Sequence, residues 1–540
     1  MNILAINFNH DGAAALLREG ELAGYVSTER FSRRKKHPGI RASDIEDIVD
    51  QAGLQLRDID LVQLLNLNNM DSPEVVRLHG SNLKETWPEF WIDGTYSRMN
   101  LLGATLPCSV LHYAAHHAMH AAAAYFFSPF ESGVSLACDP IGASAFFMRG
   151  TQQVGIRSYL QMVAPRVYDK VAASLFGTGL TGAGKLMGLA PYGADDRVID
   201  YPALLAMPYM AAYERLVELT REDCTRLPVA SGEPLNATLA YHAQALLEFE
   251  LEQLFTQLHG LCIELGVEPN LCLSGGTALN SVANQRCFAA SNFKGFYAHP
   301  ACGDDGTPIG AALMEWHVAR RQPKLHRSNR AAMYSCRTYD RDIARTVQNY
   351  ANRVDVSEQK DYIHAAARMI SEGQVIGWFQ GASEIGPRAL GNRSILADPR
   401  RAQMKDYINS SIKRREGFRP FAPSILREHA LEWFRIEESP FMLRVAPIST
   451  RTVPAVTHVD GTTRFQTVAA QDNALYHRLI GQVFELTGVP MVLNTSFNGP
   501  GEPIVETPAD ALECLLATGL DALVFPGLIV RPAARRVTHA

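Results

Sequence analysis

The chain has 540 residues, 47% of them hydrophobic and 20% charged, and its net charge is −5. This length exceeds what one hydrophobic core supports, so two or more domains are expected. The small net charge argues against nucleic acid as the main partner, because neutralising phosphates requires a large basic excess. The sequence has no apolar run of membrane-spanning length and opens on strand-like residues rather than a signal peptide, which predicts a cytoplasmic protein.

Three short apolar runs at the amino terminus, Ile3–Ile6, Ala13–Leu17 and Leu22–Val26, predict three strands. A polar loop ending in Asp11-Gly12 separates the first two runs, and a glycine-containing turn separates the next two. The loop could present backbone N–H groups to a phosphate, or hold Asp11 for a metal or a hydroxyl. A plain hairpin turn is the alternative, since Asp-Gly commonly makes one.

A pair of histidines stands in an alanine-rich run from Tyr113 to Phe127. If this run is helical, His116 and His120 lie one turn apart on the same face, where both imidazoles can reach one metal ion. The nine cysteines include no Cys-x-x-Cys pair, so the remaining ligands must be carboxylates from elsewhere in the chain. Taken alone, such a pair is more typical of ordinary helix histidines, solvated or hydrogen-bonded.

Residues 133–150 repeat the amino-terminal plan of an apolar run, an aspartate-containing loop, a second apolar run and a glycine turn. The repeat predicts an α/β fold of two related halves, each supplying one loop to a shared cleft. Asp139 ends the first of these runs and is the first expected partner of the histidines. The alternative for a single aspartate at this position is a turn cap.

Residues 177–193 are rich in glycine and suggest two motifs. Gly177-x-Gly179-x-x-Gly182 matches a dinucleotide fingerprint but follows no clear strand. Gly179-x-x-x-x-Gly184-Lys185 departs from a P-loop because Leu186 replaces the required hydroxyl side chain. We interpret the segment as a glycine-rich loop, in which Lys185 is a candidate phosphate ligand.

Further along, apolar spacing predicts a long helix over residues 236–265. It leads to a strand, the turn Gly275-Gly276 and a second helix that begins near Asn280. Glycine at a strand-to-helix junction lets a ligand approach the backbone, which suits a nucleotide. The next loop contains Asp304 and Asp305, a second acidic source for the metal.

Residues 319–329 have the composition of a linker, which closes a first domain at 1–325 and leads to a second at 338–540. The second domain concentrates glycine, proline, arginine and hydroxyl side chains in four segments, the composition of an anion-binding pocket. Arginines exposed in surface loops are the alternative for any one segment. The candidate ligands in these segments are Arg388, Arg393, Lys413, Arg419, Arg464, Asn494, Ser496 and Asn498.

Three segments carry a family resemblance: Ser383–Ile395, Arg419–Pro423 and Asn494–Asn498. With the His-His-x-x-His pattern and the loop at 303–306, they make the chain similar to the NodU/CmcH-type O-carbamoyltransferases over nearly its whole length. The resemblance implies an amino-terminal Kae1-like domain of the actin/Hsp70-type duplicated fold and a carboxyl-terminal YrdC-like α/β domain.

The resemblance also implies a two-step reaction. Carbamoyl phosphate and ATP, with Mg²⁺, would react in the second domain to carbamoyl-adenylate and pyrophosphate. The carbamoyl group would then pass, in the first domain, to a hydroxyl of a sugar or of a natural product such as an antibiotic.

The site residues follow from the same resemblance. The implied ligands of a divalent metal, Fe²⁺ or else Zn²⁺ or Mn²⁺, are His116, His120, Asp139 and Asp304. Asp305 is the alternative to Asp304. Lys413 and Arg419 would form the adenylate, with Arg464 as a further anion ligand. Relatives carry glycine after the aspartate of the second loop, whereas Pro140 stands here and removes an N–H that could bind phosphate.

His10, with Asp11 beside it, is the candidate base or acceptor-orienting residue, because its loop is expected to face the cleft. A tRNA threonylcarbamoyl-type transferase is an alternative, against which the second domain and the lack of a basic excess count. A noncatalytic metabolite-binding protein that retains the fold is another, and the presence of Lys413 and Arg419 argues against it. The sequence identifies neither the acceptor nor the oligomeric state.

Overall fold

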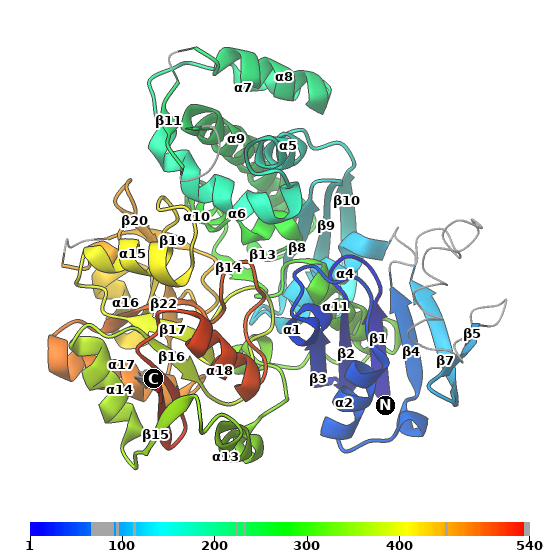
Figure 1. Ribbon diagram of the computed structural model, residues 1–540. Coiled ribbons are helices and arrows are strands. Elements are labelled where there is room, and N and C mark those ends of the chain that lie inside the picture. The colour runs from blue at the N-terminus through cyan, green and yellow to red at the C-terminus, as the bar shows by residue number, and fades with distance from the viewer. Residues whose placement is uncertain are drawn as a thin grey trace. The chain divides into compact units, whose positions relative to one another are not determined.

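The structure is a computed structural model that describes residues 1–65, 91–92, 97–111, 115–222, 224–229, 234–448 and 452–533. The chain divides into an amino-terminal unit, Met1–Ser32 with Lys36–Ala332, and a carboxyl-terminal unit, Arg33–Lys35 with Met333–Ala540. Both units are mixed α/β structures (Figure 1). Within the described ranges, no helix combines the length and apolar character that crossing a bilayer requires.

The amino-terminal unit contains two main sheets whose strand order repeats. The first has the order β3-β2-β1-β4-β7, extended by β6 and β5, and the second has the order β10-β9-β8-β13-β14. In the first sheet, β1, β2 and β3 pair antiparallel, and β4 and β7 continue the sheet parallel to β1. In the second sheet, β8, β9 and β10 pair antiparallel, and β13 and β14 continue it parallel to β8. This repetition confirms the duplicated α/β organisation that was expected.

The strands of the first sheet are β1 (Asn2–Asn7), β2 (Ala13–Arg18), β3 (Glu21–Ser27), β4 (Leu61–Leu65), β5 (Trp91–Ile92), β6 (Arg98–Leu101) and β7 (Ala104–Leu111). Those of the second are β8 (Ser132–Asp139), β9 (Gly142–Arg149), β10 (Gln152–Tyr159), β13 (Asn270–Ser274) and β14 (Gly295–Ala298). The central strands β1 and β8 are buried along nearly their whole length, which is why they read as continuous apolar runs.

Close packing fixes the elements that surround the histidines. These are α4 (His116–Phe127), the short turn η5 (Asp304–Gly306) and α11 (Thr307–Leu313). A Cβ atom at Gly310 would lie 1.7 Å from the carbonyl oxygen of Met119, so only glycine lets α11 pack directly on α4. On the opposite side, Ser135 Oγ of β8 donates a 2.7 Å hydrogen bond to the carbonyl of Ala121. Residues 112–114, which include the start of the predicted alanine-rich run, lie outside the described residues.

The glycine-rich segment is helical, so its interpretation as a loop was wrong. Helix α5 (Ala164–Phe176) ends at Gly177, whose φ is 76°, and α6 (Gly179–Leu189) follows directly. A Cβ atom at Gly182 would lie 3.0 Å from the carbonyl oxygen of Ala172 on α5. At Gly182 the small residue therefore serves the packing of α6 on α5. The long predicted helix is confirmed as α9 (Ala237–Glu264).

The carboxyl-terminal unit is built on one sheet of the order β15-β24-β23-β16-β17-β22-β18-β21. Alternate residues of its central strands face opposite sides: Trp378 packs in a cluster with α14 and α17, and its neighbour Phe379 packs in a cluster with α13 and α18. Figure 1 shows α14 and α17 together on one side of this sheet. The helices are α13 (Asp340–Gln348), α14 (Tyr362–Ser371), α17 (Ala474–Thr487) and α18 (Pro508–Ala517).

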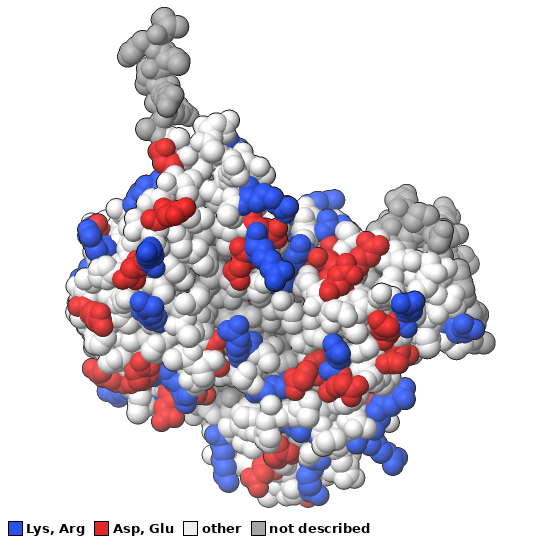
Figure 2. All heavy atoms as spheres, turned by 90° about the horizontal axis from the view of Figure 1, so that it is seen from below, with Lys and Arg blue, Asp and Glu red and all other residues white. Residues whose placement is uncertain are grey.

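The strands of this sheet are β15 (Val354–Glu358), β16 (Ile376–Phe379), β17 (Arg393–Ala397), β18 (Ala422–Leu426), β21 (Gln466–Val468), β22 (Met491–Ser496), β23 (Ala522–Phe525) and β24 (Leu528–Pro532). A separate antiparallel pair, β19 (Val445–Pro447) and β20 (Thr462–Arg464), carries Arg464 at its end. On the face drawn in Figure 2, Lys and Arg side chains of the described residues are interspersed with Asp and Glu.

Candidate functional site

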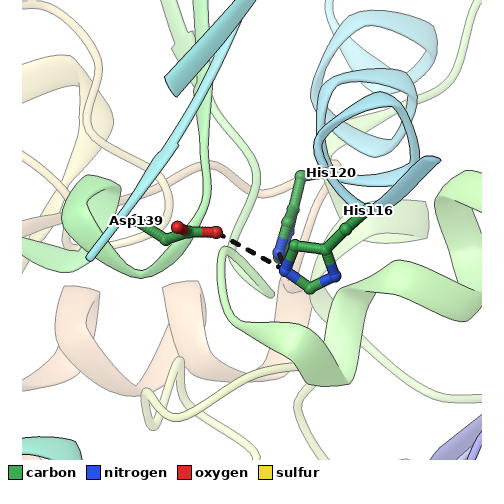
Figure 3. A group of neighbouring side chains, drawn as sticks. All are labelled: His116, His120 and Asp139. Atoms are coloured by element: carbon green, nitrogen blue, oxygen red, sulfur yellow. Dashed lines mark hydrogen bonds and ion pairs between the residues drawn. The ribbon is translucent and has the colours of Figure 1, made fainter. Parts of the chain in front are cut away.

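The two helix histidines point their Nε2 atoms at each other. The distance from His116 Nε2 to His120 Nε2 is 3.2 Å, and both side chains are almost fully buried. Figure 3 shows both rings reaching from α4 toward Asp139 at the end of β8. Burial lowers the pKa of His120, against the opposing effect of its contact with Asp304, and so favours the neutral imidazole that a metal binds.

Asp139 meets the histidines from the second sheet. Its Oδ2 lies 3.5 Å from His116 Nε2, and the ligand atoms of His116, His120 and Asp139 all lie within 4.8 Å of one another. Burial acts to raise the pKa of Asp139, but hydrogen bonds with His116 and His117 outweigh it and hold that pKa well below its usual range. The carboxylate is therefore ionised at neutral pH.

Of the two neighbouring aspartates in η5, Asp304 is the one that reaches the histidines. Its Oδ1 lies 3.3 Å from His120 Nε2 and 3.5 Å from His116 Nε2. Asn9 donates to its Oδ2 over 3.2 Å. Asp305 has different surroundings: burial, and then the charge of Asp11, raise its pKa to about 7.

The four side chains suit a divalent metal ion. Two imidazole nitrogens and two carboxylate oxygens converge, and both carboxylates are ionised. Atoms that carry negative charge or lone pairs repel one another at these distances, and a cation between them stabilises the arrangement. Imidazole and carboxylate together are compatible with Fe²⁺, Zn²⁺ and Mn²⁺. The donor set therefore fits the metal that the resemblance implies, without selecting among these ions.

His10 approaches the same group from the first sheet. Its Nε2 lies 3.5 Å from Asp304 Oδ2, and its Nδ1 lies 3.1 Å from Asp11 Oδ2. Lys36 Nζ donates to the same Asp11 oxygen over 2.7 Å. The hydrogen bond with Asp11 raises the pKa of His10, with burial opposing. The loop after β1 thus places His10 beside Asp304, one of the candidate metal ligands.

The predicted nucleotide residues of the amino-terminal unit fall into two kinds. Gly275 has a φ of 82°, and a Cβ atom there would lie 2.2 Å from the carbonyl oxygen of Cys138, whereas Gly276 has open space around it. Asn280 is buried, caps α10 (Ser281–Ala290) through Ala283 N–H and bonds to Gln244. These contacts make Gly276 the more accessible part of the turn.

Lys185 lies on α6, with its Nζ 5.4 Å from the centre of the Phe176 ring. It therefore projects from a helix rather than from a phosphate-binding loop.

Four arginines of the carboxyl-terminal unit interact electrostatically. Burial lowers the pKa of Arg464 far below its usual range, and the charges of Arg388, Arg415 and Arg419 lower it further. Burial and Arg419 lower the pKa of Arg415 to about 9. Glu416 lies 3.9 Å from Arg419. Buried Arg464 Nε has no hydrogen-bond partner within the described residues. The cluster is a ready site for a multiply charged anion.

Lys413 is buried and holds a loop. Its Nζ donates to the carbonyl oxygens of Ser496 and Asn498, and to Asn498 Oδ1 over 2.7 Å. Ser496 Oγ in turn donates to Asn498 Oδ1 over 2.6 Å. Burial, and then the charge of Arg415, lower the pKa of Lys413 well below its usual range. Its N–H groups are directed at these acceptors, so Lys413 fixes the shape of the loop after β22.

Arg393 and Asn494 are also enclosed. The guanidinium of Arg393 lies 3.5 Å from the centre of the Phe379 ring and donates to the carbonyls of Gln380, Gly381 and Glu506. Asn494 donates to the carbonyl of Ala389. These contacts hold Arg393 and Asn494 in the framework of the sheet and its loops.

Sequence reasoning assigned no role to Arg415 and His117. Arg415 stands two residues after Lys413 in a basic run, so its position in that run was an available signal. His117 adjoins His116, but its side chain bonds Asp139 and Ser144, and no spacing rule predicts those two contacts.

Comparison with known proteins gives consistent matches. Residues 2–313 match the family model described as Carbamoyltransferase N-terminus, and residues 367–531 match Carbamoyltransferase C-terminus. Nodulation protein NolNO of Sinorhizobium fredii is 33% identical over 97% of this chain and 79% of its own. Nodulation protein NolO of Bradyrhizobium diazoefficiens is 35% identical over 77% of this chain and 78% of its own. An uncharacterized protein of Synechocystis sp. is 32% identical over 99% of this chain and 97% of its own.

Proposed function

The chain belongs to the carbamoyltransferase family, and on that premise we propose that it is an ATP-dependent O-carbamoyltransferase acting on a hydroxyl of a natural product or sugar. In this proposal the domain at 338–540 forms carbamoyl-adenylate and the domain at 1–325 transfers the carbamoyl group. Atom balance requires water to release the phosphate of carbamoyl phosphate. The resulting carbamate then displaces pyrophosphate from ATP, and the acceptor finally displaces AMP.

The observation that carries the proposal is the arginine cluster of Arg388, Arg415, Arg419 and Arg464. Adenylate formation brings a carbamate against a triphosphate, and both are anions. The positive charges of the four arginines repel one another in the absence of a ligand. A bound phosphate group offsets this repulsion and accepts charge-assisted hydrogen bonds from the guanidinium groups, so binding of such an anion is strongly favourable. Lys413 keeps the loop at Ser496 and Asn498 in a fixed shape beside β22.

The second step is assigned to the histidine and aspartate group. His116, His120, Asp139 and Asp304 would hold a divalent metal, which when bound polarises the carbamoyl carbonyl and favours loss of AMP. His10 takes the proton of the acceptor hydroxyl at Nε2. Its Nδ1 bond to Asp11 leaves Nε2 as the basic nitrogen, and Lys36 keeps Asp11 in place.

The test is incubation of metal-loaded protein with ATP, carbamoyl phosphate and a panel of hydroxylated metabolites. Pyrophosphate release and a carbamoyl mass gain on one acceptor are the expected results. Omission of carbamoyl phosphate is the control for ordinary ATP hydrolysis. Metal-loaded protein that releases no pyrophosphate would overturn the proposal.

A His10→Ala variant tests whether adenylate formation and carbamoyl transfer use different residues. It should still release one burst of pyrophosphate, because the first step uses the other unit, while acceptor carbamoylation falls by about 10²-fold or more. Normal acceptor-dependent turnover by this variant would remove His10 from the mechanism.

A further inference from the structure

His117 is the one histidine of the His-His-x-x-His pattern that the proposed reaction does not use. It leaves α4 in a different direction from His116 and His120, yet it reaches the same carboxylate. Its Nε2 lies 3.2 Å from Asp139 Oδ2, the oxygen that also lies 3.5 Å from His116 Nε2. His117 therefore contacts the same carboxylate oxygen of a proposed metal ligand that faces His116.

The far side of the imidazole is also held. His117 Nδ1 lies 3.0 Å from Ser144 Oγ on β9, and Ser144 Oγ lies 3.1 Å from Ser158 Oγ on β10. Ser144 and Ser158 are direct partners in the antiparallel register of these strands. Ser144 is buried and Ser158 is exposed, so the chain of polar contacts runs from Asp139 to the edge of the sheet.

The direction of each hydrogen bond follows from chemistry. An ionised carboxylate can only accept, so His117 donates from Nε2 to Asp139. In the neutral imidazole Nδ1 must then accept, and its hydrogen-bond partner within the described part of the chain is Ser144. Ser144 donates to Nδ1 and accepts from Ser158. One tautomer of His117, with the proton on Nε2, satisfies the whole chain.

The other oxygen of Asp139 is fixed by the loop. Asp139 Oδ1 accepts a 2.9 Å hydrogen bond from the backbone N–H of Ile141. Pro140 has no N–H, so Ile141 provides the first donor after the aspartate. With Oδ1 held by Ile141 and Oδ2 held by His117, the carboxylate has one orientation, in which Oδ2 also faces His116.

We propose that His117 is a positioning residue of the metal centre, which orients the Asp139 carboxylate through its Nε2–H while Ser144 selects the required tautomer. The proposal rests on the proposed metal centre and assigns His117 no contact with metal or substrate. Hydrogen bonds to ligand side chains typically change metal affinity by about 10- to 100-fold.

The first experiment measures metal affinity by chelator competition, with Zn²⁺ and with Fe²⁺ under anaerobic conditions. His117→Leu removes the donor and should weaken binding about 10- to 100-fold. His117→Gln places an amide N–H close to the position of Nε2 and should recover most of that loss. If His117 only filled space, His117→Gln would not restore metal affinity relative to His117→Leu.

His242→Leu is the matched control. His242 is also buried in the amino-terminal unit and also contacts an aspartate, with Nε2 3.1 Å from Asp195 Oδ1. It shares no residue with the proposed metal ligands. Its replacement should lower thermal stability and leave metal affinity unchanged. Equal losses of affinity in His117→Leu and His242→Leu would indicate general destabilisation and overturn the proposal.

The second experiment needs no metal. Long-range ¹H–¹⁵N spectra of histidine-labelled, metal-free protein report which ring nitrogen carries the proton. His117 should show the Nε2–H tautomer, and Ser144→Ala should give a mixture of the two tautomers. A predominant Nδ1–H tautomer in the wild type would overturn the proposal. Wild-type protein that binds no metal refutes the proposed metal centre itself, whereas tight binding that His117→Leu leaves intact refutes only the role of His117.

Discussion

His116 Nε2 lies 3.2 Å from His120 Nε2, so their lone pairs cannot both face the gap unless a proton or a cation lies between them. Asp139 and Asp304 approach the same gap with ionised oxygens. A bound divalent ion, as proposed above, would relieve the repulsion among all four groups. Removing it with a chelator should lower the midpoint of thermal unfolding, and adding metal at about 100 times its Kd should restore about 2.7 kcal/mol of stability.

Asp304→Asn and Asp305→Asn should differ in metal binding although the residues are adjacent. Asp304 Oδ1 lies 3.3 Å from His120 Nε2, whereas the backbone carbonyl of Asp305 accepts from Tyr25. We expect Asp304→Asn to weaken binding by about tenfold or more and Asp305→Asn to leave it within about threefold, measured by metal competition. The reverse order would move the ligand to Asp305.

Gly275→Ala should be far more disruptive than Gly276→Ala. A Cβ atom at position 275 would lie 2.2 Å from the carbonyl oxygen of Cys138, and its φ of 82° disfavours any side chain. Position 276 has nothing within 4 Å of the added atom. We expect a loss of about 3 kcal/mol or more for Gly275→Ala and under about 1 kcal/mol for Gly276→Ala in denaturant unfolding. Similar losses of unfolding free energy in the two variants would show that the turn shifts to accommodate the Cβ atom at position 275.

Arg464→Met should weaken ligand binding and raise the stability of the ligand-free protein. Removing one of four mutually repelling cations should stabilise the ligand-free protein by about 1 kcal/mol, a rise of about 2–4 °C in the unfolding midpoint of a unit of this size. ATP and carbamoyl phosphate should bind at least about tenfold more weakly by calorimetry, because a buried charged hydrogen bond is lost. Arg478→Met, an exposed arginine of the same unit, is the control and should change neither quantity. A destabilised Arg464→Met protein would argue that an acidic partner neutralises the cluster.

The antiparallel pair β19 and β20, which carries Arg464, should contribute less stability in acid. Burial acts to raise the pKa of Asp460, but hydrogen bonds with His458 and Thr462 outweigh it and lower this pKa to about 2. A lowered carboxylate pKa contributes stability above the unfolded pKa, and this contribution is lost as pH falls toward the folded value. Asp460→Asn should therefore cost about 1 kcal/mol at neutral pH, allowing for solvent screening, and progressively less below about pH 4. Denaturant unfolding of both proteins across this range checks the trend, and a pH-independent difference would contradict it.

Local patterns in the sequence were sufficient for the fold class. The apolar runs of β1, β2 and β3 recur in β8, β9 and β10 with the same loop and turn, because each half must bury the same kind of central strand. The spacing of His116 and His120 places them on one face of any helix. The glycine-rich segment was misread because glycine permits a loop and a tight helix contact equally, and only the neighbouring helix α5 decides between them.

Contacts across long stretches of chain had to come from the tertiary structure. The sequence by itself determined the duplicated α/β halves, the histidine pair and the arginine-rich segments, since each depends on residues a few positions apart. It did not determine that Asp304 rather than Asp305 meets the histidines, that Lys413 is occupied by the loop at Asn498, or that His117 bonds Asp139. Those pairings depend on how closely α11 packs on α4 and how the strand ends meet, because hydrogen bonds require a match within a few tenths of an ångström.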